Sequence, residues 1–289
     1  MTAVYKRELR SYFSSMIGYV FIAAMTVFVG LFFSANNLEL GYPYFAYTIE
    51  SVASILILAI PILTMKSIAE EKKAKTDQML LTYPVSVTSV IMGKYLSMMT
   101  IYIIPLIISC FCPIIIAAVG QTSYILGDYL AIFAMLCMGA LFVAIGMFIS
   151  SLTENQIIAA VGSMVALLLI YFWDDLVKRI PTTSAASLIG LLAIIIIIAL
   201  VFSAISHNQF VSIITGLVGG IIIVICYVAK SSMFSGLINT ILGAFSCMGM
   251  LQNFTRYNSF DLGGIFLYLS LAAMFVFLTV QSVQKRRWS

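Results

Sequence analysis

Charged residues are scarce in this sequence. Asp, Glu, Lys and Arg together make up 9% of the 289 residues, whereas hydrophobic residues make up 62%. The mean hydropathy is +1.11. A soluble domain of this length cannot bury so much apolar surface in its core. The composition therefore excludes a soluble globular protein and predicts an integral membrane protein.

Histidine and cysteine offer little for catalysis or metal binding. The single histidine, His207, lies in the short polar stretch HNQF, where we expect a polar turn residue rather than a general base. Cys110 and Cys112 are two positions apart, which places them on different faces of a helix. We therefore expect structural cysteines, no catalytic residue and no metal site in this chain.

Long apolar runs recur along the chain, and each is long enough to cross a hydrocarbon layer of about 30 Å as a helix. The runs are continuously apolar rather than alternating, which favours helices over a barrel. We predict an all-α polytopic membrane protein with about eight transmembrane helices, forming a single transmembrane domain over residues 1–289. The expected segments are residues 16–35, 50–66, 95–119, 128–151, 157–173, 187–205, 211–229 and 264–282. Only HNQF separates the sixth and seventh segments, so a tight hairpin of two spans and a pair of re-entrant segments both fit this spacing.

Ionisable residues are missing from the cores of these segments, and Glu50 and Asp128 lie only at their outer ends. Ion-driven carriers and proton relays need ionisable groups at membrane depth. The phosphate-binding pattern G-x-x-x-x-G-K-[ST] is also missing, because Gly93 and Lys94 lack the earlier glycine and the following Ser or Thr. The sequence therefore predicts a chain that neither couples to an ion gradient nor hydrolyses a nucleotide itself.

The basic residues predict the orientation. With both termini in the cytoplasm, 11 of the 15 Lys and Arg residues lie on the inner side, in agreement with the positive-inside rule. The inner set comprises Lys6, Arg7, Arg10, Lys66, Lys72, Lys73, Lys75, Lys94, Lys285, Arg286 and Arg287, and the outer set comprises Lys178, Arg179, Lys230 and Arg256.

The few charges are concentrated in one place, because seven of them lie between Lys66 and Asp77. Seven charges at membrane depth would cost on the order of 20 kcal/mol, so this stretch is expected in the cytoplasm. Residues 67–94 then form the longest inner loop, with a short helix, a turn at Pro84 and the entrance to the third span. A solvated connector that only sets the topology is the simpler interpretation. The apolar residues that share this loop with the charges instead favour a docking surface; they are Met79, Leu80, Leu81, Tyr83 and Val85.

This loop contains, in order, an acidic pair, a basic residue, a Thr and an acidic residue, Leu-Leu, Pro-Val-Ser and Gly-Lys. These residues are Glu70, Glu71, Lys72, Thr76, Asp77, Leu80, Leu81, Pro84, Val85, Ser86, Gly93 and Lys94. The order resembles the cytoplasmic segment of ABC transporter permeases of the second, mainly export-type class, especially the gliding-motility and copper-enzyme-maturation branch. Lys75 stands where that family usually has glycine.

Three further stretches are similar to the same family. Residues 1–15 resemble its interfacial elbow helix, residues 148–160 its second cytoplasmic turn, and residues 278–288 its C-terminal ending. Typical members have six spans, so this chain is expected to add two more to a six-span core. We also expect residues 231–264 to form amphipathic helical turns at the outer surface.

The first 15 residues also have the pattern of an interfacial helix. Tyr5, Leu9, Tyr12 and Phe13 share one helical face, and the basic residues occupy other faces. The alternative is a plain extension of the first span. Basic residues and Trp commonly anchor helix ends at the lipid headgroups. The residues expected at the membrane interface are Lys6, Arg7, Arg10, Arg286, Arg287 and Trp288.

The resemblance implies a transmembrane permease subunit of an ATP-driven ABC transporter in a bacterial plasma membrane. It would pair with a second permease, identical or related, and with two copies of a cytoplasmic ATPase. ATP and Mg would be bound by the ATPase, and this chain would have no cofactor and no enzyme activity. The implied ATPase-coupling residues are Glu70, Glu71, Thr76, Asp77, Leu80, Leu81, Pro84, Glu154 and Asn155.

The apolar spans favour an amphiphilic, lipid-linked or peptide cargo over a small ion. The net charge of +4 needs no nucleic-acid partner, since the topology accounts for it. Two other functions fit the sequence: a non-transporting membrane scaffold or signalling partner of an ATPase, and an ion-coupled carrier or channel.

Overall fold

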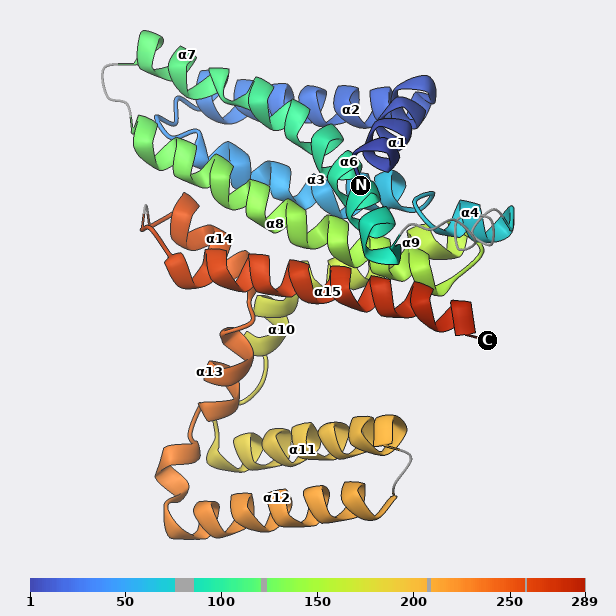
Figure 1. Ribbon diagram of the computed structural model, residues 1–289. Helices are drawn as coiled ribbons and strands as arrows, with labels where there is room; N and C mark the ends of the chain where they lie inside the picture. Colours follow the sequence, from blue (N-terminus) through green and yellow to red (C-terminus); the bar gives the residue numbers. More distant parts are fainter. Residues whose placement is uncertain (76–85, 121–123, 207–208, 258, 289) are drawn as a thin grey trace. The chain divides into compact units, whose positions relative to one another are not determined.

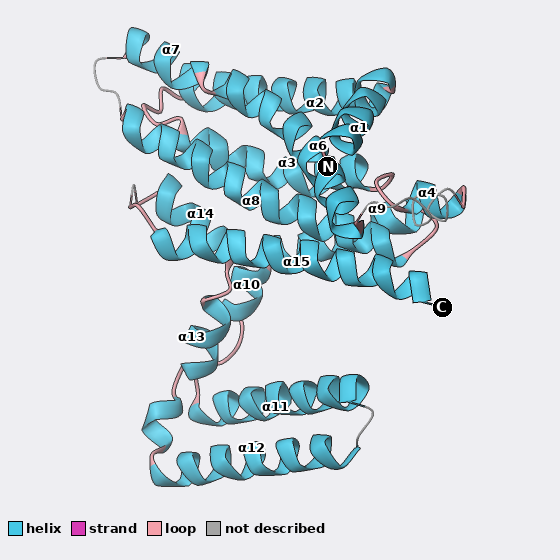
Figure 2. Ribbon diagram, in the orientation of Figure 1, coloured by secondary structure: helices cyan, strands magenta, loops and turns pink. Residues whose placement is uncertain are grey.

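The computed structural model describes residues 1–75, 86–120, 124–206, 209–257 and 259–288, and within these ranges it contains helices and no strand (Figures 1 and 2). The protein is thus an all-α polytopic membrane protein, as predicted. The chain divides into two compact units, Met1–Tyr171 with Cys247–Ser289, and Phe172–Ser246. This division concerns contacts within the chain, so the single permease domain stays a prediction.

A helix lies at each of the eight predicted segments. They are α2 (Met16–Phe33, extended by the π-helix η1, Ser34–Glu39), α3 (Ala46–Thr64), α6 (Val87–Ser109) with α7 (Phe111–Val119), α8 (Ile125–Leu152), α9 (Gln156–Tyr171), α11 (Ser184–Ser206), α12 (Gln209–Ala229) and α15 (Leu262–Trp288). The remaining elements are α1 (Thr2–Ser14), α4 (Ala69–Lys73), α10 (Trp173–Lys178), the 3-10 helix η2 (Ser231–Phe234), α13 (Leu237–Gly243) and α14 (Cys247–Thr255).

Five helices in the described part of the chain are long and apolar enough to cross a membrane. They are Met16–Glu39 (α2 with η1), Ala46–Lys73 (α3 with α4), Val87–Val119 (α6 with α7), Ile125–Leu152 (α8) and Leu262–Lys285 (most of α15). Shorter apolar helices cover Gln156–Tyr171, Ser184–Ile197 and Gly219–Val228. The five long helices establish a multi-pass protein, and the total of eight spans stays a prediction.

The helix of the predicted third span includes the entrance expected before residue 95, and it is divided in two. This helix starts after Ser86, whose side chain accepts a hydrogen bond from the Ser89 amide at 3.3 Å. It breaks at Cys110, three residues before Pro113, which lacks the N–H that would bond to the preceding turn. The Tyr129 hydroxyl donates to the Cys110 carbonyl at 3.1 Å, so a side chain of α8 satisfies the backbone at the break.

Helix α8 is the centre of the larger unit, and α3, α6, α9, α14 and α15 all pack against it (Figure 1). Close approach to α6 depends on Gly139. A Cβ atom built there would lie 2.2 Å from the ring of Tyr102, whose side chain is fully buried. The Tyr102 hydroxyl donates to the Met135 carbonyl at 2.8 Å. A glycine and a tyrosine thus fit together where α6 and α8 meet.

Polar side chains on α8 and near α14 hold the N-terminal end of α3. Arg256 donates two hydrogen bonds to the Glu50 carboxylate, from Nε at 2.9 Å and from an amino group at 2.7 Å. Gln252 on α14 adds a third at 3.1 Å. On the neighbouring helix α8, the buried Asp128 accepts the Ala46 amide at 3.0 Å and so caps α3. The two acidic residues at the ends of the predicted spans therefore hold α3 in place.

The predicted amphipathic region 231–264 is helical but belongs to both units. Its first part contains η2 and α13, and its second part contains α14, which packs against α3, α8 and α9. The buried residues of α14 include Leu251 and Phe254, with at most 1% of their surfaces exposed. The location of this region at the outer surface stays a prediction.

The smaller unit contains a helical hairpin, in which α11 packs along α12 (Figure 1). In the same unit, α10 and α13 are held together by side chains that donate hydrogen bonds to backbone carbonyls. The Asn239 amide donates to Val177 and Ile180, both at 3.0 Å, and the Trp173 indole donates to Leu242 at 2.8 Å. Residue 207, the single histidine, lies outside the described residues.

Asp261 caps the N-terminus of α15, which yields a first prediction. It accepts the Gly264 amide at 3.0 Å and the Asn253 side-chain amide at 2.8 Å. Asp261→Ala removes both acceptors and is expected to lower the free energy of unfolding by about 1 kcal/mol. Asp261→Asn retains an oxygen for the Gly264 amide and is expected to cost less. Thermal unfolding of the purified variants in detergent measures both values.

The same cap predicts a dependence on pH. Hydrogen bonds from Gly264 and Asn253 lower the pKa of Asp261 below its ordinary value of about 3.9. The cap therefore contributes fully above that ordinary value and loses its contribution as pH falls through the lowered pKa. Asp261→Asn should remove this part of the acid sensitivity. Equal acid sensitivity in the variant and the parent would contradict the prediction.

Candidate functional site

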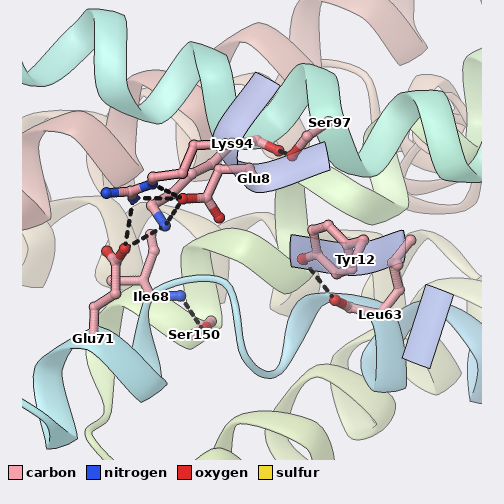
Figure 3. A network of polar contacts seen from close by, with 9 residues as sticks. Glu8, Tyr12, Leu63, Ile68, Glu71, Lys94, Ser97 and Ser150 are labelled. Atoms are coloured by element: carbon pink, nitrogen blue, oxygen red, sulfur yellow. Dashed lines mark hydrogen bonds and ion pairs between the residues drawn. The ribbon is translucent and has the colours of Figure 1, made fainter. Parts of the chain in front are cut away.

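Helix α4 carries part of the predicted coupling segment, and it is tied to the end of α8. Two backbone amides at its start, from Ile68 and Ala69, donate to the Ser150 hydroxyl at 3.3 and 3.1 Å. The Ser150 hydroxyl in turn donates to the Met65 carbonyl at 3.2 Å. A single hydroxyl on α8 thereby joins the end of α3 to the start of α4, and Figure 3 shows its contact with the Ile68 amide.

Lys72 makes a second connection between α4 and α8. Its side chain is buried and donates to the Ser151 carbonyl. The same carbonyl accepts the hydroxyl of Ser282, on α15, at 3.4 Å. The last turn of α8 therefore gathers contacts from α4 and from the C-terminal helix.

The other side of α4 is held by an ionic network, which we define as Arg7, Glu8, Glu71 and Lys94. The Lys94 ammonium lies 2.8 Å from the Glu71 carboxylate and 3.3 Å from the Glu8 carboxylate. Figure 3 shows Lys94, Glu8 and Glu71 close together, and the Arg7 guanidinium also lies 3.2 Å from the Glu71 carboxylate. Because only 3% of the Lys94 side chain is exposed, these partners offset the cost of removing its charge from water. The network joins α1, α4 and α6.

The Gly-Lys pair has two linked roles in this arrangement. At Gly93 a Cβ atom would lie 3.1 Å from Val4 and 3.2 Å from the Tyr5 amide, so the glycine lets α1 approach α6 closely. Lys94 can then reach Glu8 on the same helix α1. The Tyr5 hydroxyl, 2.9 Å from that of Thr100, adds a third contact between the two helices. Gly93 thus allows α1 and α6 to approach closely, and Lys94 provides the positive charge that pairs with Glu8.

Helix α1 has the two faces that its sequence predicts. Tyr12 is buried and Tyr5, Leu9 and Phe13 are half-buried, whereas the predicted anchors Lys6, Arg7 and Arg10 are exposed. The apolar face packs against α2 and α6. Burial raises the pKa of the Tyr12 hydroxyl, which stays neutral and donates to the Leu63 carbonyl at 3.2 Å. The role of α1 as an interfacial elbow helix stays a prediction.

The structure separates the two members of the predicted acidic pair. Glu71 faces the rest of the protein and joins the ionic network, while Glu70 is exposed. Asn155, in the predicted second contact, accepts the Ile157 amide at 2.9 Å and so caps the start of α9. Glu154 precedes it in the same turn. Thr76, Asp77, Leu80, Leu81 and Pro84 lie outside the described residues, and so do the side chains of the predicted anchors Arg286, Arg287 and Trp288.

Glu8 and Lys94 are central to the network but were not predicted as site residues. The sequence presents Lys94 as one of many inner basic residues, and Glu8 lies among the basic residues of α1. One signal is available: a Gly-Lys pair inside an apolar helix implies a buried charge that needs an acidic partner. Ser150, which holds α4 by its hydroxyl, has no comparable signal.

Lys75 has a backbone conformation that glycine favours. Its φ is +55°, and it follows the end of α4 at the position where many helices end in a left-handed glycine. Its amide bonds to the Lys72 carbonyl at 3.1 Å, and that of Ala74 bonds to Glu70 at 2.9 Å. The residue that departs from the family pattern therefore adopts the geometry that the usual glycine would provide.

This geometry yields another prediction. Lys75→Gly removes the cost of a left-handed non-glycine residue and is expected to stabilise the end of α4 by up to about 1 kcal/mol. The matched control is Lys73→Gly, inside the helix, which should destabilise it by about 1 kcal/mol. Limited proteolysis of this loop in reconstituted protein compares the two. Faster cleavage of the Lys75→Gly variant than of the parent would contradict the expectation.

Among the described residues, no group of three or more His, Cys, Asp or Glu side chains is placed to hold a metal ion. The geometry at α4 is that of a mechanical connection: one short helix fastened by hydrogen bonds to α8 and by ion pairs to α1 and α6.

The model of the ABC-2 family transporter proteins matches residues 2–187, which is more than half of the chain. The chain belongs to the ABC-2 transporter family. The match includes α1, α4, α6 and α8, and with them the entire ionic network. No curated protein matches the chain.

Membership makes the chain the membrane permease component of an ABC transporter, a class in which the permease works with an ABC ATPase. In this ABC-2 permease, α12, α13, α14 and α15 lie beyond the matched segment. The match covers five of the eight predicted spans completely, those corresponding to α2, α3, α6 with α7, α8 and α9.

Proposed function

We propose that this permease exports an amphiphilic, lipid-linked or peptide substrate, driven by a cytoplasmic ATPase that docks at residues 67–94. The apolar composition of the helices supports a cargo that is itself partly apolar. The resemblance of the loop to the gliding-motility and copper-enzyme-maturation branch supports a place in that branch of the ABC-2 family.

The observation that carries the proposal is the asymmetry of α4. One side is fastened to α1, α6 and α8 through Glu71, Lys72 and the amides at its start. Glu70 and Lys73, in contrast, are exposed. A partner that binds the exposed residues can therefore move α4, and the fastened side transmits that movement to the long helices.

Movement requires that the ATPase bind one arrangement of the permease better than another. In the proposed cycle, ATP and Mg bind in the ATPase, and its closure shifts α4 together with the cytoplasmic ends of α6 and α8. A path for the substrate then opens toward the outside. The active assembly contains two permeases and two ATPases, with both permease termini in the cytoplasm of a bacterial cell, in agreement with the positive-inside rule.

The test is charge reversal at the exposed position. Glu70→Lys is expected to reduce co-purification of the ATPase and permease-stimulated ATP turnover by about tenfold, the effect of losing roughly 1.4 kcal/mol of docking free energy. Insertion and thermal stability of the permease should be unchanged. Transport into inverted vesicles should fall in parallel, which separates a transporter from a scaffold.

The matched control is Glu39→Lys, the same reversal at an exposed glutamate at the far end of η1. It should leave ATPase binding and turnover unchanged. Normal coupling in Glu70→Lys would exclude docking at α4. Loss of coupling in both variants would instead indicate a general effect of added positive charge.

A further inference from the structure

A groove runs between α6 and α15 on the larger unit, with a volume of about 470 Å³. Thr88, Met92 and Tyr95 form its α6 wall, and Ala272, Val276 and Phe277 belong to its α15 wall. The small side chain of Ala272 and the neighbouring Ala273 leave room between larger residues. Phe277 is 59% exposed, so the groove has an open, apolar margin. Such a surface suits a flexible hydrocarbon chain.

One end of the groove is polar. Gln281 and Gln284 line this end, and both also line a second hollow of about 550 Å³. The second hollow adds Ser282 and Lys285. No acidic side chain lines either hollow among the described residues. The shared glutamines make the two hollows neighbours, with amide donors and an ammonium group at the end of an apolar groove.

The dimensions agree with one leaflet of a bilayer. From Leu269 to Gln284 the helix rises about 22 Å, at about 1.5 Å per residue. Half of a bilayer with its headgroup regions measures about 20 to 22 Å. The polar end is the C-terminal end of α15, where the sequence continues from Lys285 with two arginines. The basic residues place this end at the cytoplasmic leaflet, whose anionic lipids attract them.

We propose that the groove between α6 and α15 binds an anionic phospholipid of the cytoplasmic leaflet. An acyl chain lies along Met92, Ala272 and Val276, and the phosphate accepts hydrogen bonds from Gln281, Gln284 and Lys285. The proposal is independent of the transported substrate and of docking at α4.

The charges favour a lipid over a second copy of the chain in this groove. A two-fold dimer in a membrane brings the same surface of both subunits together at the same depth. Lys285 of each copy would then face its counterpart, and like charges would meet beside the groove. An anionic lipid headgroup instead complements this end.

The experiment measures which lipid the protein retains. Purified protein is reconstituted in nanodiscs of equal parts phosphatidylglycerol and phosphatidylcholine, released, and analysed by native mass spectrometry. We expect retention of phosphatidylglycerol over phosphatidylcholine. Ala273→Trp fills the groove and should lower retention of both lipids about tenfold. Lys285→Gln removes the cation and should reduce the preference for phosphatidylglycerol about fivefold, equivalent to about 1 kcal/mol for one basic residue near the surface.

Two matched controls accompany these variants. Ala23→Trp places the same ring on an exposed position of α2, and Lys73→Gln removes an exposed cation from α4. Both should retain lipid as the parent does. Equal retention of the two lipids by the parent, or unchanged retention in Ala273→Trp, would overturn the proposal. Efficient disulfide formation between two Ala273→Cys chains, with no lipid retained, would overturn it in favour of a second copy.

Discussion

Glu71→Lys is expected to destabilise the permease and to abolish ATPase coupling together. The substitution removes the carboxylate 2.8 Å from the Lys94 ammonium and places a second positive charge beside it. Lys94 is 3% exposed, so water cannot compensate for the lost partner. Breaking a buried ion pair in this way costs about 3–5 kcal/mol. Thermal unfolding in detergent and permease-stimulated ATP turnover measure the two effects.

Charge exchange provides the control for this prediction. The double variant Glu71→Lys with Lys94→Glu restores two positive and two negative charges to the network and is expected to recover part of the stability. Glu70→Lys should leave stability unchanged, because Glu70 is exposed. If Glu70→Lys destabilised the protein as much as Glu71→Lys, the ionic network would not be what holds α4. Failure of the exchange to recover any stability would count against the pairing of Glu71 with Lys94.

Gly139→Ala is expected to have the second large effect. The added methyl group would lie 2.2 Å from two ring carbons of Tyr102, and this ring is fully buried between α6 and α8. The Tyr102 hydroxyl is held by Met135, so the ring cannot move without losing a hydrogen bond. Overpacking of this kind costs about 1–3 kcal/mol. The expected result is a lower thermal midpoint and less folded protein in the membrane.

Gly30→Ala is the matched control in α2. Gly30 is exposed, and a Cβ atom built there meets nothing within 4 Å. Alanine favours a helix over glycine by about 0.8–1.0 kcal/mol, so this variant should be neutral or slightly stabilised. A thermal midpoint for Gly139→Ala equal to or above that of Gly30→Ala would contradict the packing at Tyr102.

The sequence predicts the helices well because their signal is local. Each of the eight predicted segments contains a helix, since an uninterrupted apolar run has few other structures available in a membrane. The two faces of α1 are likewise readable from helical periodicity. The predicted entrance to the third span, after the turn at Pro84, is the start of α6 at Val87.

The site was harder to predict because its contacts join distant residues. The pair of Lys94 with Glu8 joins α6 to α1, and hydropathy gives no information about such a partner. For the same reason the sequence groups Glu70 with Glu71 as one acidic pair, whereas the fold turns them to different surroundings. The left-handed Lys75 is a similar case: the family pattern marks the position, and only the backbone shows that its geometry is retained.

The bond between Glu50 and Arg256 has a consequence for biosynthesis. The two residues are 206 positions apart, so the carboxylate at the start of α3 leaves the ribosome long before its arginine. A chain that stops after Ser246 contains the whole of the family match yet lacks α14 and α15. In the nascent permease the start of α3 therefore has its Asp128 cap but not its ion pair until translation is nearly finished, and products truncated before Arg256 never form that pair.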